Sequence, residues 1–152
     1  MNPRIKIINF DMDGTLFDLY GVENWLAKLH AADPSPYAEA APMLDMKKLA
    51  WLCRRLQSKG WKINIVSWLA KGSSAPYDEA VTLAKISAIR SAFPDFWFNN
   101  VHIVPYGTPK AKIECGILFD DEPKNRIDWC NASRDNSAYN VNNILEILEM
   151  LI

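Results

Sequence analysis

The sequence predicts an α/β domain of three layers, α/β/α, with a central parallel sheet of about five strands. Short apolar, β-rich runs alternate along the chain with segments whose apolar residues recur every three to four positions, and this alternation is typical of β-α-β crossovers. The chain has 152 residues, of which 49% are hydrophobic. A chain of that length buries a full core without disulfides or a structural metal. We expect residues 1–152 to form one domain.

The first half predicts a strand, an insertion and a helix. A buried strand is expected at residues 5–10, ending in the acidic loop 11–15. Apolar residues then recur with helical spacing only over 22–29, and the Pro-rich stretch 33–36 stops this helix. Residues 18–43 are therefore interpreted as a small insertion, a minimal helical cap. A core helix should follow from Asp45, a suitable N-cap, to Gly60, which suits a left-handed C-terminal position.

The second half predicts three more strands. The second strand is expected at 61–66, and the helix that opens at Ser74 should end before Pro94, because proline disfavours helical geometry in the residue before it. A third strand at 101–104 leads to Thr108-Pro109, interpreted as the cap and first turn of a short helix. A fourth strand at 116–119 ends in two aspartates. After a polar stretch, a helix that starts near Ile144 closes the chain.

The net charge and the cysteine content limit which binding partners and which cellular compartment we expect. The 17 Lys and Arg against 18 Asp and Glu give a formal net charge of −1, which argues against nonspecific nucleic-acid or membrane-surface binding. The 3 cysteines form no CxxC, so free thiols in a reducing compartment are expected. No apolar run approaches ~20 residues and no cleavage pattern follows the first one. We therefore expect no signal peptide, no membrane span and a cytoplasmic protein.

Polar side chains gather where the predicted strands end. Parallel strands present their carboxyl ends at one edge of the sheet, where α/β proteins bind ligands. The residues concerned are Asp11 and Asp13 after the first strand, Ser67 after the second, Lys110 after the third, and Asp120 with Asp121 after the fourth. Carboxylates that converge in this way repel one another unless a cation lies among them, and all-oxygen ligation suits Mg²⁺. The sequence therefore predicts a magnesium site.

This arrangement suits phosphoryl transfer. A carboxylate beside the metal, Asp11, can attack phosphorus and form an aspartyl-phosphate. Asp13 can protonate the leaving oxygen and then deprotonate water, and Gly14 lets the backbone turn tightly beside the phosphate. The Ser67 hydroxyl and the Lys110 ammonium would bind the phosphoryl oxygens.

Together these motifs resemble the four motifs of the haloacid-dehalogenase-like hydrolases. They are DMDGT, a strand-terminal Ser, a Lys before a helix, and LFDD, in that order over residues 11–121. The resemblance implies a Rossmann-like fold and hydrolysis of phosphate esters, because an Asp at the position of Asp13 is typical of the phosphatases. It also implies that Asp11 and Asp120 bind Mg²⁺ through carboxylates and Asp13 through its carbonyl. Asp121 would be a further ligand or an acceptor behind the ligands.

Finer assignments follow from the same stretches. The run FDDEPKNRIDW is similar to the corresponding segment of the 5′(3′)-deoxyribonucleotidases, which favours nucleoside monophosphates as substrates. Lys112 is the alternative to Lys110 as the phosphate-binding lysine. The candidate substrate-binding residues are Gly14, Thr15, Phe17, Tyr20, Trp68 and Tyr106, of which the aromatic ones could stack on a base or sugar.

Two other functions stay open from the sequence. A non-catalytic protein of the same fold could bind a phosphorylated ligand or a partner protein. A phosphatase acting on polynucleotide ends would fit a small cap and an open crevice, although the chain lacks the surplus of basic residues that nucleic acid favours. A second subunit of a homo-oligomer is a candidate to cover a site with so small a cap.

Overall fold

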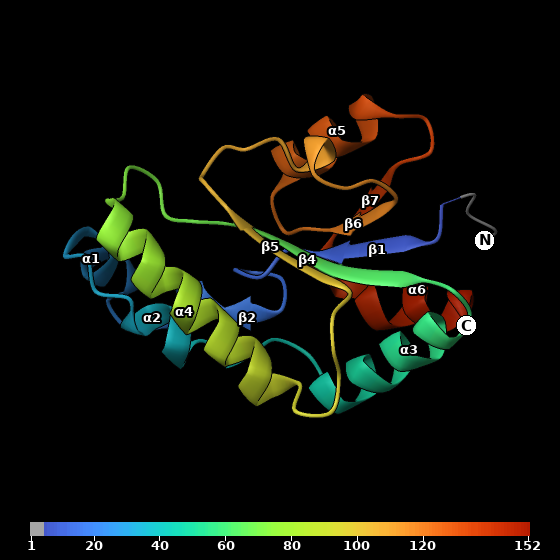
Figure 1. The fold of residues 1–152 in the computed structure, drawn as a ribbon, viewed down its shortest axis with the longest axis horizontal. Helices are drawn as coiled ribbons and strands as arrows, with labels where there is room; N and C mark the ends of the chain where they lie inside the picture. The colour runs from blue at the N-terminus through green and yellow to red at the C-terminus, as the bar shows by residue number, and fades with distance from the viewer. Residues whose placement is uncertain (1–4) are drawn as a thin grey trace.

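The computed structural model describes residues 5–152 and confirms the three-layer fold with a central parallel sheet of five strands (Figure 1). The strand order is β5-β4-β1-β6-β7. The strands are β1 (Ile7–Phe10), β4 (Lys62–Trp68), β5 (Asn100–Val104), β6 (Ile117–Phe119) and β7 (Ser137–Tyr139). The expectation about a signal peptide concerns in part residues 1–4, which lie outside the described residues.

Helices cover both faces of the sheet (Figure 1). On one face lie α3 (Met46–Ser58), α4 (Ala75–Ala92) and α6 (Ile144–Leu151), and on the other lies α5 (Pro123–Ala132). The main core lies between the sheet and the helices α3, α4 and α6. Its fully buried members include Phe10 of β1, Ile65 of β4 and Leu52 of α3. Burial of these large apolar side chains is the main source of the free energy of folding.

The helix α3 forms for the reasons that the sequence indicates. The Asp45 side chain accepts a hydrogen bond from the backbone N of Lys48 at 3.1 Å, which satisfies one free amide of the first turn. Leu49, Leu52, Cys53 and Leu56 share its buried face. The helix ends at Ser58, and Gly60 follows its C-cap with a φ of +91°, the left-handed conformation that glycine adopts without strain.

A row of three asparagines, of which Asn9 and Asn64 are buried, fixes the register of the sheet. Asn9, Asn64 and Asn100 are paired across β1, β4 and β5. Asn100 donates to the side chain of Asn64 and Asn64 to that of Asn9, each at 3.1 Å, and Asn9 donates to the carbonyl of Ile117 on β6 at 3.1 Å. A slip of one residue between two neighbouring strands would break the bond that joins them. The row therefore helps hold the carboxyl ends of four strands at one edge.

The segment after β1 forms a small unit beside α4. The strands β2 (Phe17–Asp18) and β3 (Ala41–Pro42) form an antiparallel pair, and between them lie η1 (Leu19–Gly21), α1 (Trp25–His30) and α2 (Ser35–Glu39). Tyr37 of α2 packs with Tyr77 and Val81 of α4 in a second buried cluster. This packing attaches the insertion to α4.

The sequence analysis was wrong about several elements. The first helix of the insertion, α1, ends at His30, before the stretch 33–36 as expected, but a second helix that was not predicted, α2, begins at Ser35, because a proline in the first turn of a helix is tolerated. β4 runs on through Ser67 and Trp68, which pair with β5. The turn after β5 is the short helix η2 (Lys110–Lys112), with Pro109 rather than Thr108 at its cap.

Two further elements, α5 and β7, lie in the stretch that the sequence analysis left as polar, and η3 (Val141–Asn143) precedes α6. Trp129 is the one buried side chain of α5, so the helix has no apolar stripe to reveal it, and β7 is a three-residue edge strand. Over residues 5–152, no helix is both long enough and apolar enough to cross a membrane.

Candidate active site

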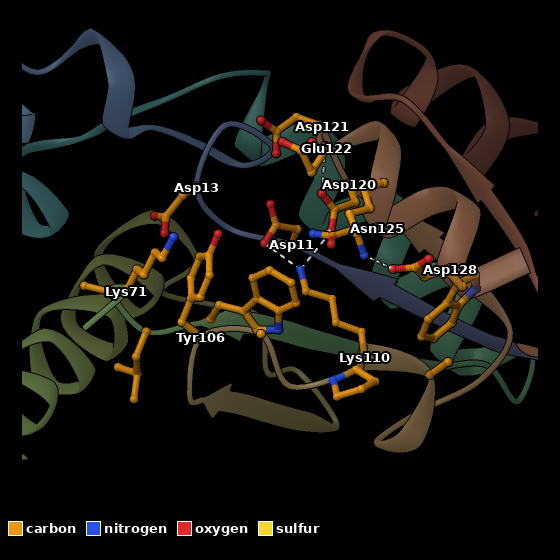
Figure 2. Close-up of a pocket in the computed structure, with 18 of the residues that line it drawn as sticks. Asp11, Asp13, Lys71, Tyr106, Lys110, Asp120, Asp121, Glu122, Asn125 and Asp128 are labelled. Atoms are coloured by element: carbon orange, nitrogen blue, oxygen red, sulfur yellow. Dashed lines mark hydrogen bonds and ion pairs between the residues drawn. The ribbon is translucent and has the colours of Figure 1, made fainter. Parts of the chain in front are cut away.

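Three carboxylates meet at the carboxyl edge of the sheet. Asp11 follows β1, and Asp120 and Asp121 follow the neighbouring strand β6. One oxygen from each lies within 4.8 Å of the others (Figure 2). The sheet register produces this meeting, because Phe10 pairs with Phe119 and the backbone N of Asp11 donates to the carbonyl of Phe119 at 2.9 Å. Three of the four residues predicted to hold a metal are therefore neighbours in space.

Lys110 lies between two of these carboxylates. Its Nζ is 2.9 Å from Asp11 Oδ1 and 2.8 Å from Asp120 Oδ2 (Figure 2). Burial disfavours the charged ammonium, but the two carboxylates outweigh it and hold the pKa of Lys110 above its ordinary value. The other candidate, Lys112, is exposed and also lines the pocket. Lys110 is thus the lysine in direct contact with the carboxylates.

The remaining negative charge fits a divalent cation. Burial and the neighbouring Asp11 raise the pKa of Asp121 to about 7 and the pKa of Asp120 above its ordinary value. Three carboxylates faced by one ammonium leave an excess of negative charge, and every donor in the cluster is an oxygen. A hard cation with a preference for oxygen ligands, such as Mg²⁺, fits this donor set.

The loop after β1 is tied closely to the loop after β6. Gly14 has a φ of +79°, and a Cβ at this position would overlap the Asp121 carboxylate. The Thr15 hydroxyl donates to Asp11 Oδ2 at 3.2 Å and accepts from the backbone N of Asp121 at 3.2 Å. Thr15 is buried, and neither residue lines the pocket. Both therefore position the carboxylates instead of facing the open site, where substrate contacts were expected.

Asp13 and Ser67 lie apart from the three carboxylates and share a different partner. The ammonium of Lys85, on α4, is 2.9 Å from Asp13 Oδ2 and 2.7 Å from Ser67 Oγ. Asp13 lines the pocket, whereas Ser67 is fully buried beside it. Sequence reasoning assigned nothing to Lys85. The sequence does contain a signal for it. Lys85 is four residues from Val81 and four from Ile89, so it falls on the same helical face as these two apolar residues, which are buried on α4.

A pocket of about 880 Å³ opens above the carboxylates. Trp68, Tyr106 and Tyr20 line it as predicted, and Trp68 meets Tyr106 edge to face at 5.0 Å between ring centroids. Thr108 fixes the indole by accepting its N–H at 2.8 Å. Phe17 was predicted to contact substrate, but the structure buries it in the main core and it does not line the pocket. Its place in β2 turns it toward the apolar interior.

The helix α5 supports the carboxyl end of β6. Asn125 donates to Asp120 Oδ2 at 3.2 Å, and Arg126 donates to the backbone carbonyl of Asp120 at 2.8 Å. The sequence analysis gave neither residue a role. Both residues lie within six positions of Asp120, in the first turns of a helix that starts at Pro123, and this closeness could have indicated their contact with Asp120.

Fold and site together define an α/β/α protein with a cluster of three carboxylates, of a kind that could hold a metal ion, at the carboxyl edge of its sheet. Among solved structures, the chain is similar to the D,D-heptose 1,7-bisphosphate phosphatase from B. bronchiseptica complexed with magnesium and phosphate. The TM-score is 0.62 at 12% identity, over 97% of this chain and 100% of that one. This likeness confirms the fold implied by the resemblance to haloacid-dehalogenase-like hydrolases. No family model and no curated protein matches the sequence.

Proposed function

We propose that this chain is a Mg²⁺-dependent phosphomonoesterase that works through an aspartyl-phosphate on Asp11. The observation that carries the proposal is the meeting of Asp11, Asp120 and Asp121 within 4.8 Å, with Lys110 in contact with two of them. The similarity to a phosphatase complexed with magnesium and phosphate supports it. Asp11, Asp120 and Asp121 would hold the metal through their carboxylates, and Asp13 through its carbonyl. When bound, the ion would neutralise charge on the phosphoryl group and on the carboxylate that attacks it.

Each side chain of the site has a separate role in the proposed reaction. An oxygen of Asp11 attacks phosphorus, and the bond to the leaving oxygen breaks as Asp13 donates a proton to it. Asp13 then takes a proton from the water that attacks the same phosphorus, and Asp11 is released as a carboxylate. Lys110 and the Ser67 hydroxyl bind the phosphoryl oxygens, which carry more negative charge in the transition state than in the substrate.

The pocket favours a small phosphorylated substrate with an aromatic or flat part. A volume of about 880 Å³ lies within the range of small-molecule sites. The Trp68 and Tyr106 rings form one wall, with the Lys71 ammonium 6.0 Å from the Tyr106 centroid. Such a wall suits stacking on a nucleobase. Nucleoside monophosphates are therefore the finer substrate proposal.

The test is turnover of an aryl phosphate by the purified chain. Hydrolysis should require Mg²⁺, stop in excess chelator, and fall by at least about 10³-fold in Asp11→Asn, since the variant lacks the nucleophile. Asp135→Asn is the matched control: this exposed acid precedes β7 at the opposite edge of the sheet, and its loss should leave activity unchanged. Full activity in Asp11→Asn would refute the mechanism. A panel of nucleoside 5′- and 3′-monophosphates and sugar phosphates then tests the substrate class.

A further inference from the structure

A lysine is completely buried behind the proposed site. Lys85 has 0% of its surface exposed, although it lies on α4 among apolar neighbours. Lysines are almost never fully buried unless they are paired, because an ammonium loses its hydration there. The proposed mechanism does not use Lys85. The buried ammonium therefore needs hydrogen-bond acceptors that replace its water. Those acceptors show which residues Lys85 can influence.

Every donor of the Lys85 ammonium has an acceptor. The Nζ lies 2.9 Å from Asp13 Oδ2, 2.7 Å from Ser67 Oγ and 2.8 Å from the carbonyl of Trp68. The ring centroid of Tyr37, from the insertion, lies 5.1 Å from the same Nζ. An ammonium has three N–H donors and no acceptor, so none is left for a substrate. Lys85 can act on the reaction only through these neighbours.

Contact with Lys85 decides the direction of the Ser67 hydroxyl. A hydroxyl that accepts a hydrogen bond from an ammonium must point its own hydrogen elsewhere. Within residues 5–152, the bond from Lys85 is the one hydrogen bond of the Ser67 side chain. The hydroxyl hydrogen is thus free to donate, and Ser67 is held on β4 at the carboxyl edge. Because Ser67 is fully buried and does not line the pocket, this hydrogen can reach an anionic oxygen only at the wall of the pocket beside Asp13 and Trp68, which do line it.

The same ammonium fixes Asp13. Its Oδ2 is bound to Lys85, while the residue lines the pocket with 20% of its side chain exposed. One carboxylate oxygen is therefore anchored and the other stays available to the pocket. The anchor also links the loop after β1 to the helix α4, against which the insertion packs. Asp13 and Ser67 thus share one rigid support.

We propose that Lys85 is a positioning residue, which orients the Ser67 hydroxyl as a donor to the phosphoryl group and holds the Asp13 carboxylate for proton transfer. The proposal rests on the proposed phosphatase function. Because all three donors of the Lys85 ammonium are used by its neighbours, its removal should slow the chemical step more than it weakens substrate binding. If Lys85 served only to stabilise the fold, its replacement would lower the free energy of unfolding but would not change the kcat of the folded molecules.

The experiment combines Lys85→Met, Ser67→Ala and the double variant, assayed with an aryl phosphate and Mg²⁺. Lys85→Met should lower kcat about 10–100-fold, the scale of a misplaced acid or hydrogen-bond donor, and change KM less than about threefold. The double variant should lose less than the product of the two single losses, because both changes disable the same hydroxyl. Lys48→Met, which removes an exposed lysine on α3, is the control and should keep the wild-type kcat.

Circular dichroism and urea unfolding establish that each variant is folded. Lys85→Gln, which keeps a shorter, neutral donor, should have a kcat between those of wild type and Lys85→Met. A kcat within about threefold of wild type in folded Lys85→Met would overturn the proposal, as would losses that multiply in the double variant. Failure of both Lys85 variants to fold would overturn it too, since Lys85 would then be a folding residue. An inactive wild-type chain would instead refute the proposed phosphatase function.

Discussion

Replacing Lys110 with methionine tests the electrostatics of the site. Its ammonium lies 2.9 Å from Asp11 and 2.8 Å from Asp120. Coulomb's law gives about 6 kcal/mol of attraction for each pair at an effective dielectric constant of ~20. The desolvation of three buried charges offsets most of this. Since the change leaves two buried carboxylates uncompensated, we expect Lys110→Met to lower the free energy of unfolding by about 3–5 kcal/mol without metal.

Urea unfolding of Lys110→Met in chelator and in Mg²⁺ measures this effect. Because a bound divalent ion would also neutralise Asp11 and Asp120, the loss of stability should be smaller in Mg²⁺ than in chelator. Lys112→Met, at the neighbouring exposed lysine, is the matched control and should change stability little. A loss below about 1 kcal/mol in chelator, or an equal loss in both conditions, would refute the reasoning.

Three further results are expected. In metal-free protein the folded state keeps the Asp121 proton between pH 3.8 and about 7, where the unfolded state has released it, so this group's contribution to stability falls as pH rises through that window. The rise in Tm caused by Mg²⁺ should therefore be larger at pH 8 than at pH 6. Gly14→Ala should weaken Mg²⁺ binding in calorimetry, because its Cβ meets the Asp121 carboxylate. Leu52→Ala, at a fully buried site, should lower the free energy of urea unfolding by about 2–5 kcal/mol.

A specific outcome would contradict each of these three predictions. The difference between pH 6 and pH 8 should disappear in Asp121→Asn, and its persistence there would assign it to another group. Wild-type Mg²⁺ affinity in Gly14→Ala would mean that the two loops can separate without cost to the metal site. A loss below about 1 kcal/mol in Leu52→Ala would mean that the core repacks around the cavity.

The parts of the fold with strong periodicity could be predicted from the sequence. The stripe of α3 and the runs of β1, β4 and β6 are apolar because they are buried, so pattern and burial agree. The helix α5 and the strand β7 could not be predicted in this way. α5 buries a single side chain, Trp129, and the three residues of β7 are paired on one side only. Tertiary contacts, rather than local pattern, fix these two elements.

The site divides along similar lines. The carboxylates could be predicted because strand ends of a parallel sheet converge, and this rule needs only the position of each strand. The role of Lys85 depends on which side of α4 meets Asp13 and Ser67, which only the packed structure gives. Phe17 illustrates the converse error: it follows the acidic loop in sequence, but β2 turns its ring into the core. Closeness in sequence to the acidic loop predicted contact with the pocket for Tyr20 but not for Phe17.

The most direct test of the central mechanism is chemical trapping of the phosphorylated carboxylate. The chain would be mixed with Mg²⁺ and an aryl phosphate, quenched within one turnover and reduced with borohydride, which converts an acyl phosphate to an alcohol. Peptide mass spectrometry should then find homoserine in place of Asp11, and only when both Mg²⁺ and substrate were present. An unmodified Asp11 under conditions of turnover, or homoserine at another aspartate, would contradict the account.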